Sequence, residues 1–261
     1  MPVYIGTSGW QYDHWRGTFY PEGVAQSRWL EFYSEQFRVV ELNNSFYRLP
    51  NKETFTGWAE RTPDDFVLAA KMSRYLTHVK RLKDPREPVE RFLRHAGGLG
   101  SKLGPVLLQL PPTLKADADV LREVLGAFPA GVRVALEPRH DSWFTDETAA
   151  VLSDYNAAMC LTDRQAEPVT PVWRTADWTF LRFHEGTGSP HPCYKRSTME
   201  TWVERLADGW GKKRSDLFVF FNNDPRACAL RDAVVFAELL QSAGFETSRV
   251  PGRRAVKIDR S

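Results

Sequence analysis

Short apolar runs recur along the chain at regular intervals, with polar or helical segments between them. Each run has five or six residues rich in Val, Leu, Ile and Phe, which is the pattern of a strand buried on both faces. We expect eight strands from this pattern. They cover residues 3–7, 39–43, 66–71, 105–110, 132–137, 158–163, 179–184 and 217–222.

Several of the intervening segments have apolar residues at helical spacing. Trp29, Tyr33 and Phe37 follow the first run, and similar patterns lie at 120–128 and 230–237. These segments predict helices that lie between the strands.

Two helix ends are also marked. Thr145 is suited to cap the start of a helix before Tyr155, because Asp146 and Glu147 follow it in the first turn. Gly244 falls where the last helix would end in a left-handed conformation.

Eight buried strands alternating with helices predict a parallel (β/α)8 TIM-like barrel, and we expect residues 1–261 to form a single domain. An open doubly wound sheet is the alternative, but no glycine-rich phosphate fingerprint follows any strand. The sixth connection should be irregular, because residues 168–177 contain two prolines and no helical period. The basic tail after about residue 251 is expected to be loose.

Most predicted strands end in polar or charged side chains. In a (β/α)8 barrel these ends meet on one face, where reacting groups sit. Residues two apart on a strand share a face, so Glu41 accompanies Asn43 and Glu137 accompanies Arg139. Buried charges need partners, which predicts ion pairs between either glutamate and Lys71 or Arg182.

We assign the side chains at these ends to two groups. Glu41 and Glu137 are the leading acid or base candidates, followed by Lys71 and His184. Lys71 and two arginines are expected to hold a phosphate or carboxylate. The expected substrate-binding residues are Ser8, Trp10, Tyr12, Asn43, Tyr47, Gln109, Arg139, Trp143, Asp163, Arg182 and Asn222.

The loop at residues 6–21 is unusual for a strand-to-helix connection. It places five aromatic residues among three glycines and ends in Pro21. We interpret it as a wall of the site, in which Trp10 and Tyr12, together with Trp143, cover a sugar or base face. The alternative is that these rings only fill one end of the barrel.

No cofactor is expected. A divalent metal ion held by Glu41, Glu137, Asp163 and His184 is the alternative, although positive side chains occupy the same end of the barrel. A Ser8–His184–Asp163 triad is disfavoured, because the chain has no GxSxG motif.

Composition and charge limit the classes of binding partner that the sequence supports. The chain has 261 residues and a formal net charge of +2, so it gives little support to a general nucleic-acid or membrane-surface role. Local basic runs occur at 80–86, 212–214 and 252–254. We expect a small polar or anionic partner and no membrane, and the oligomeric state stays open.

The cysteines Cys160, Cys193 and Cys228 are odd in number and widely spaced. They indicate neither a disulfide framework nor a structural zinc site. No apolar run has the length of a signal peptide or a membrane span, so we expect a cytoplasmic protein.

Seven segments resemble, in the same order, motifs of the domain of unknown function 72 family, the YecE-like proteins. They are GTSGWQYDHWRGTFYP, VVELNNSFYRLP, FVLAAKMSRYLTH, GPVLLQLPP, VALEPRHDSW, RFHEG and FVFFNND. The resemblance runs from about Tyr4 to about Leu240 and implies a TIM-like barrel, but no reaction. The chain departs from the family at two positions. Pro138 stands where the family usually has an aromatic or aliphatic residue, and Glu185 stands where the family usually joins His directly to Gly.

The residues together favour an enzyme, a hydrolase or lyase that uses carboxylate acid/base chemistry on a small anionic or phosphorylated sugar-like ligand. A nucleic-acid-binding protein or metal-dependent nuclease is one alternative, with aromatic rings for stacking and basic runs for phosphates. A barrel that binds a metabolite without turnover is another.

Overall fold

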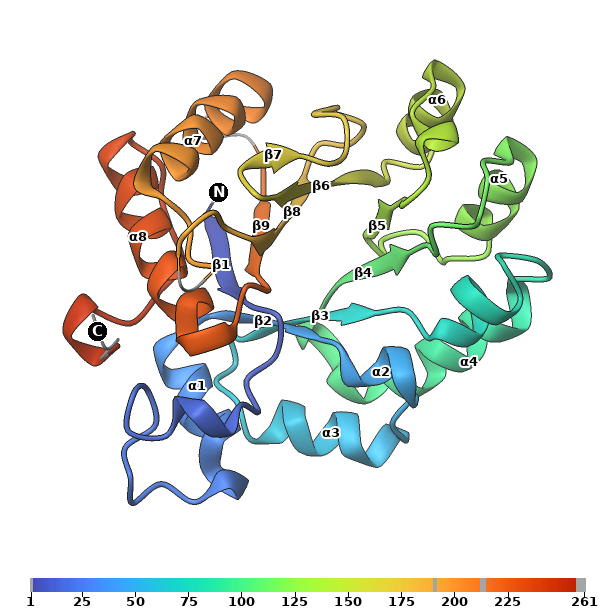
Figure 1. Cartoon of the computed structure of the whole chain (residues 1–261). Helices are drawn as coiled ribbons and strands as arrows, with labels where there is room; N and C mark the ends of the chain where they lie inside the picture. The colour runs from blue at the N-terminus through green and yellow to red at the C-terminus, as the bar shows by residue number, and fades with distance from the viewer. Residues whose placement is uncertain (1, 190–191, 212–214, 257–261) are drawn as a thin grey trace.

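The computed structural model describes residues 2–189, 192–211 and 215–256, in which strands and helices alternate around a closed barrel (Figure 1). Eight parallel strands are ordered β5-β4-β3-β2-β1-β9-β8-β6, and pairing of β5 with β6 closes the ring. This confirms the predicted TIM-like barrel. The strands are β1 (Val3–Thr7), β2 (Val39–Leu42), β3 (Val67–Lys71), β4 (Leu103–Gln109), β5 (Val134–Glu137), β6 (Ala158–Arg164), β8 (Thr179–Glu185) and β9 (Leu217–Phe221).

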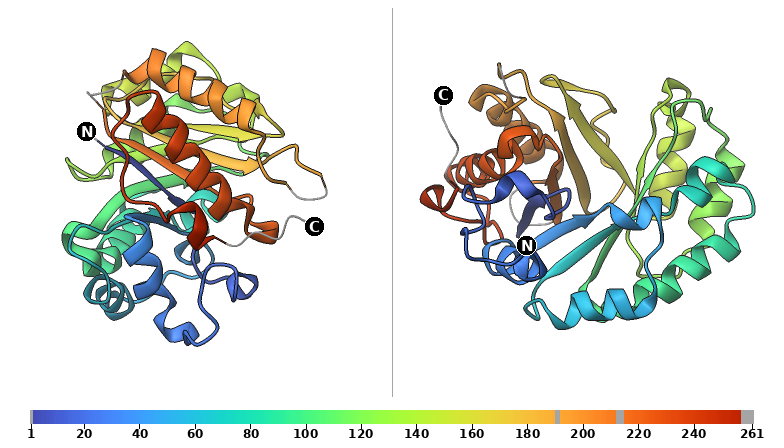
Figure 2. Two further views of the ribbon diagram at one scale, coloured as in Figure 1. Left: turned by 90° about the vertical axis from the view of Figure 1, so that its left-hand side faces the viewer. Right: turned by 60° about the horizontal axis from the view of Figure 1, so that its bottom comes forward.

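The helices lie on the outer side of the strands (Figure 2). They are α1 (Trp29–Gln36), α2 (Asn44–Tyr47), α3 (Lys52–Glu60), α4 (Arg86–Ala96), α5 (Ala118–Gly126), α6 (Asp146–Asp154), α7 (Arg196–Trp210) and α8 (Cys228–Ser242). Short 3₁₀ or π turns cover Asp13–Trp15, Gln26–Arg28, Tyr75–Val79, Gly97–Lys102, Asp141–Trp143, Pro225–Ala227 and Arg253–Ala255.

Both predicted helix ends are present. The Thr145 hydroxyl accepts a hydrogen bond from the Thr148 backbone N–H at 3.2 Å and caps the start of α6. Gly244 follows α8 with a φ of 86°, a conformation that favours glycine.

The sixth connection is irregular, as predicted. A two-residue strand, β7 (Glu167–Pro168), pairs antiparallel with β6, and residues 169–178, which lead from β7 to β8, contain no helix. Thr170 instead binds the β6 backbone: its hydroxyl donates to the Cys160 carbonyl at 2.8 Å and accepts from the Thr162 N–H at 2.9 Å. A threonine hydroxyl thus satisfies backbone groups on β6 where a regular partner is missing.

The barrel interior has two layers of different chemistry. The lower one, which we call the floor layer, is apolar and buried. At its edge β1 and β2 approach so closely that a Cβ on Gly6 would lie 2.2 Å from the Val39 carbonyl oxygen. The floor layer consists of Val39, Ala69, Leu107, Ala135, Phe180 and Phe220.

Two residues further along the same strands the interior becomes polar. We call this the mouth layer, since it lies at the C-terminal ends of the strands. Because side chains alternate, it points inward like the floor layer below it. It consists of Glu41, Lys71, Gln109, Glu137, Arg182 and Asn222.

The prediction about cysteines is wrong for two of the three. Cys193 and Cys228 form a disulfide with Cα atoms 4.9 Å apart, whereas Cys160 is free and buried. The two bonded residues lie 35 positions apart, in the loop before α7 and at the start of α8, so their contact is not visible in their spacing.

None of the helices in the described ranges is both long enough and apolar enough to cross a bilayer. The cytoplasmic location stays a prediction.

Part of the tail that was expected to be loose contacts the barrel, because Arg253 Nε donates to Glu238 Oε1 of α8 at 2.6 Å. Residues 257–261 and the basic run at 212–214 lie outside the described residues.

Candidate active site

Arg182 occupies the centre of the mouth layer, between Glu41 of β2 and Glu137 of β5. Its Nε lies 3.0 Å from Glu41 Oε1, and its NH1 donates to Glu137 Oε2 at 2.6 Å. All three side chains are buried. Burial disfavours the charged guanidinium, but the two carboxylates raise the pKa of Arg182 further above its ordinary value. Arg182 therefore stays charged, with a carboxylate on each side.

Glu137 is the most heavily bonded group in the layer. Besides Arg182, it pairs with Arg139 and accepts from Gln109 Nε2 at 3.0 Å and from His184 Nε2 at 3.1 Å. Burial alone raises the pKa of Glu137. The charge of Arg182 and the hydrogen bond from His184 outweigh burial and hold that pKa well below its usual range. Glu137 is therefore a fixed negative charge.

Glu41 has fewer partners and is equally buried. The Ser8 hydroxyl donates to Glu41 Oε2, and Arg182 NH2 donates to the same oxygen at 3.0 Å. Ser8 is itself buried and its carbonyl accepts from the Tyr12 hydroxyl at 2.5 Å. The loop that follows β1 thus orients a carboxylate instead of presenting a serine nucleophile.

Lys71, at the end of β3, is the cation that the glutamates leave without a pair. Its Nζ donates to Gln109 Oε1 at 2.7 Å and lies 4.2 Å from the centre of the Phe46 ring, and within the described residues it forms no ion pair. Burial, followed by the charge of Arg182, lowers the pKa of Lys71 from 10.5 to about 8. A neutral amine is accordingly accessible near physiological pH.

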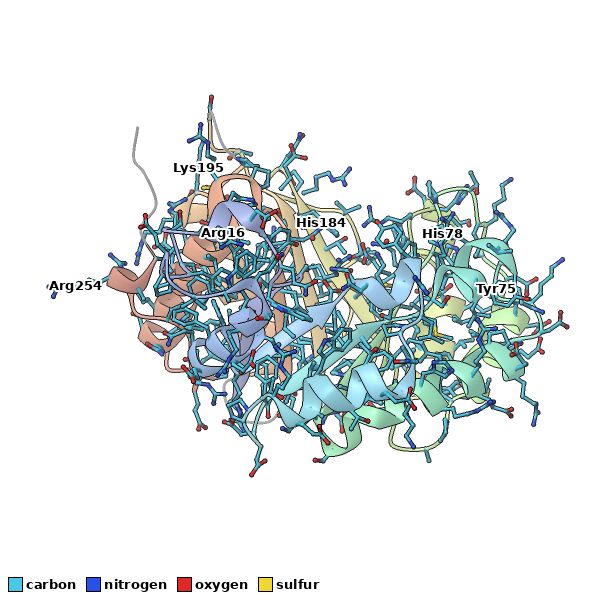
Figure 3. The ribbon with its side chains drawn as sticks, turned by 90° about the horizontal axis from the view of Figure 1, so that it is seen from below. Arg16, Tyr75, His78, His184, Lys195 and Arg254 are labelled. Carbon is cyan, nitrogen blue, oxygen red and sulfur yellow. A yellow bond between two sulfur atoms is a disulfide. The ribbon has the colours of Figure 1, made fainter. Side chains whose placement is uncertain are left out.

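His184, labelled in Figure 3, connects Glu137 to Asn222. Asn222 Nδ2 lies 3.3 Å from His184 Nδ1, so Nδ1 accepts and Nε2–H donates to Glu137. Burial lowers the pKa of His184, although the bond to Glu137 acts in the opposite direction. The imidazole is therefore neutral at neutral pH and presents Nδ1 as a base.

These groups open into a pocket of about 370 Å³ at the mouth of the barrel. The positive groups on its wall are Lys71 and three arginines, whereas both neighbouring carboxylates are already bonded to Arg182. The pocket thus presents unshared positive charge. Its lining residues are Tyr12, Asn43, Tyr47, Lys71, Gln109, Arg139, Arg164, Arg182, His184 and Asn222.

Four predicted binding residues do not line this pocket. Ser8 is buried and donates to Glu41, and the other three lie elsewhere. Asp163 faces the helices and accepts from Trp202 Nε1 at 2.7 Å. Trp143 donates from Nε1 to the Leu114 carbonyl at 2.8 Å and is buried, and Trp10 packs edge-on against another tryptophan. We correct their placement: all three belong to the outer core.

Sequence reasoning missed Arg164 and misplaced Asp163 for the same reason. On β6 the free cysteine Cys160 belongs to the barrel interior, whereas Leu161 packs on the helix side. Alternation from Cys160 puts Asp163 on the helix side and Arg164 on the barrel side. The sequence contains this alternation, but the prediction took the last polar residue of the strand without considering which face it occupies.

The residues proposed for a metal site are not arranged as ligands. Arg182 lies between Glu41 and Glu137, and Asp163 points the other way. Across the described ranges, no group of three or more His, Cys, Asp or Glu side chains is placed to hold an ion.

Comparison with known proteins agrees with this fold. The family described as "Protein of unknown function DUF72" matches residues 4–255. The chain belongs to this family. It is 28% identical over 274 residues to the UPF0759 protein YunF of Bacillus subtilis (strain 168), which covers 91% of this chain and 94% of YunF.

Two solved DUF72 structures have the same architecture. The Thermotoga maritima MSB8 protein TM1631 is 29% identical, with a TM-score of 0.80 over 92% of this chain and all of that one. The Enterococcus faecalis V583 protein EF0366 is 17% identical, with a TM-score of 0.78 over 96% of this chain and 98% of that one, a likeness of fold alone.

Glu185, where the chain departs from the family motif, has a defined place in the structure: its backbone N–H donates to the Tyr194 hydroxyl at 3.1 Å.

Proposed function

We propose that this DUF72 barrel is an enzyme, a lyase or hydrolase that binds a small anionic or phosphorylated sugar-like ligand in the mouth pocket. The observation that carries the proposal is the imbalance of charge on the pocket wall. Lys71, Arg139 and Arg164 face the cavity, while Glu41 and Glu137 are both bonded to Arg182. An anion entering the pocket meets unshared donors and no free carboxylate.

The donors that would hold the anion differ in their freedom. Arg182 is buried and engaged on both sides, so it positions the glutamates. Arg139 is partly exposed: its NH2 pairs with Glu137, and its buried Nε has no hydrogen-bond partner among the described residues. We assign Arg139 as the main anion contact, with Arg164 beside it.

Proton transfer falls to Lys71 and His184. Both line the pocket, and both have a pKa that burial lowers toward or below neutrality. Glu41 and Glu137, which sequence reasoning favoured for this role, are closed off by their ion pairs and act as positioning residues. Tyr12 and Tyr47 supply ring surface at the rim for a sugar face.

The mouth is a better candidate than a larger hollow of about 580 Å³ on the outside of the barrel. That hollow lies beside α2 and α3, and its wall combines Arg48 and His95 with neutral side chains. Neither carboxylates nor lysines line it. It therefore lacks the groups that would make an acid/base pair.

Binding of inorganic phosphate and glycerol 3-phosphate tests the proposal. Replacement Arg139→Gln should weaken both by about tenfold or more, which corresponds to roughly 1.4 kcal/mol. The matched control is Arg122→Gln, which removes the same charge from an exposed pair on α5. Equal affinity in Arg139→Gln and parent would contradict the assignment of the pocket.

The two alternatives give different results in the same assays. A nucleic-acid-binding barrel should bind single-stranded DNA with steep salt dependence and compete with phosphate for the mouth. A non-catalytic sensor should bind the phosphorylated ligand and return it unchanged. Turnover of a bound sugar phosphate separates the enzyme from both.

A further inference from the structure

Lys71 differs from Lys102, a partly buried lysine outside the pocket, in what its amine contacts. Lys102 donates to two backbone carbonyls, Ala59 O at 2.6 Å and Thr62 O at 2.7 Å, which fix its amine in place. Lys71 has a single acceptor, the Gln109 side chain, although an ammonium has three N–H donors to satisfy. The Lys71 amine is thus held by one hydrogen bond and faces the pocket, where a ligand can reach it.

The surroundings of Lys71 also argue against a role as the anion anchor. Arg139 and Arg164 already supply charge that cannot be titrated away, and a third cation beside them is disfavoured. The lowered pKa of Lys71, caused first by burial and then by Arg182, agrees with this geometry. Desolvation next to cationic groups is the arrangement that turns a lysine into a nucleophile.

We propose that Lys71 forms a Schiff base with the carbonyl group of a small anionic ketone or aldehyde, whose carboxylate or phosphate is held by Arg139 and Arg164. This inference rests on the proposed function and names its substrate class. A 2-oxo acid and a keto-sugar phosphate share the required chemistry, a carbonyl carbon close to an anionic group.

The Nζ lone pair attacks the carbonyl carbon, a C–N bond forms, and the π electrons move to oxygen. That oxygen takes one proton from the attacking amine and one from solvent and leaves as water. The nitrogen keeps its second hydrogen and becomes a positively charged iminium.

His184 is placed to use the iminium. The cation withdraws electrons from the neighbouring carbon, so a proton on that carbon or on the next hydroxyl becomes acidic. His184 lines the same pocket as Lys71, and its Nδ1 can accept that proton in exchange for its bond to Asn222. A hydrogen-bonded series Lys71–Gln109–Glu137–His184 fixes the two groups relative to each other. Carbon–carbon cleavage or α-deprotonation then follows, which favours a lyase over a hydrolase.

Reductive trapping tests the inference. The protein is incubated near neutral pH with pyruvate or dihydroxyacetone phosphate and sodium borohydride, which supplies the hydride that reduces the iminium. Peptide mass mapping should find the adduct at Lys71 at a level at least about tenfold above that at Lys102, the partly buried lysine whose amine is bonded to backbone carbonyls. Equal labelling of the two lysines would overturn the proposal.

Two matched ligands and one variant separate this inference from the proposed function. Lactate and glycerol 3-phosphate carry the same anions without the carbonyl, so they should bind and form no adduct. Lys71→Arg keeps the charge, and it should retain lactate binding and lose the adduct. If the parent binds lactate and pyruvate but pyruvate leaves no adduct, the Schiff base is wrong and the anion site stands. If none of the four compounds binds, both proposals fail.

Discussion

The floor and mouth layers of the barrel come from the same strands and point the same way, yet they have opposite chemistry. Leu107 and Gln109 on β4 illustrate the change, as do Ala135 and Glu137 on β5. The floor layer gains stability by removing apolar surface from water, whereas the mouth layer keeps charges buried at a cost that only their partners offset. A step of two residues along each strand thus separates the floor layer, which stabilises the barrel, from the mouth layer, which can react.

The largest expected effect of a single change lies in the mouth layer. Glu137→Gln removes the carboxylate that faces Arg182 and Arg139, which leaves Arg139 without its ion pair and the buried Arg182 with Glu41 alone. We expect a loss of about 3 to 5 kcal/mol in the free energy of unfolding. Urea denaturation measures it, with Glu238→Gln as the control for an exposed pair with Arg253. A loss for Glu137→Gln as small as that of the control would show that the mouth charges are hydrated.

A change in the floor layer should affect stability alone. Leu107→Ala removes a buried side chain from the barrel interior and leaves a cavity, so we expect a loss of about 3 kcal/mol. Phosphate affinity should stay within about twofold of the parent, because the pocket wall begins two residues further along. A large loss of phosphate affinity in a folded Leu107→Ala protein would break the separation between the layers.

Alternation of side chains along the strands also explains which features of this fold and site the sequence could predict. The eight apolar runs predict the eight barrel strands, and alternation within a strand predicts that Glu137 and Arg139 share a face, where they form an ion pair. The sequence could not say which cation pairs with the glutamates. Arg182 reaches both, and Lys71 reaches neither, because the outcome depends on distances across the barrel.

Contacts between outer loops were equally out of reach. Cys193 and Cys228 meet because α7 and α8 begin close together, and no local pattern marks this. Trp10 and Trp143 were expected in the pocket on their chemistry, but a large ring packs as readily under a loop as over a ligand. Asp163 was the exception, since the parity of β6 would have placed it correctly.

The smallest effect concerns the titration of Lys71 itself. The pKa of Lys71 is about 8 in the folded chain against 10.5 in the unfolded chain, so between these pH values the unfolded state binds more protons. Raising the pH through this window therefore stabilises the parent relative to Lys71→Met, which has no amine to deprotonate.

The quantity to measure is the free energy of unfolding of Lys71→Met minus that of the parent, across a pH series. It should be largest below pH 8 and shrink by roughly 2 kcal/mol by about pH 10.5, somewhat less than the full shift implies because the pocket is open to water. Lys102→Met serves as the control, since it removes a lysine outside the pocket whose amine is bonded to backbone carbonyls. A difference for Lys71→Met that does not change with pH would mean that the mouth layer leaves this amine as charged as any surface lysine. The mouth would then differ from the floor in polarity alone, with no amine prepared for reaction.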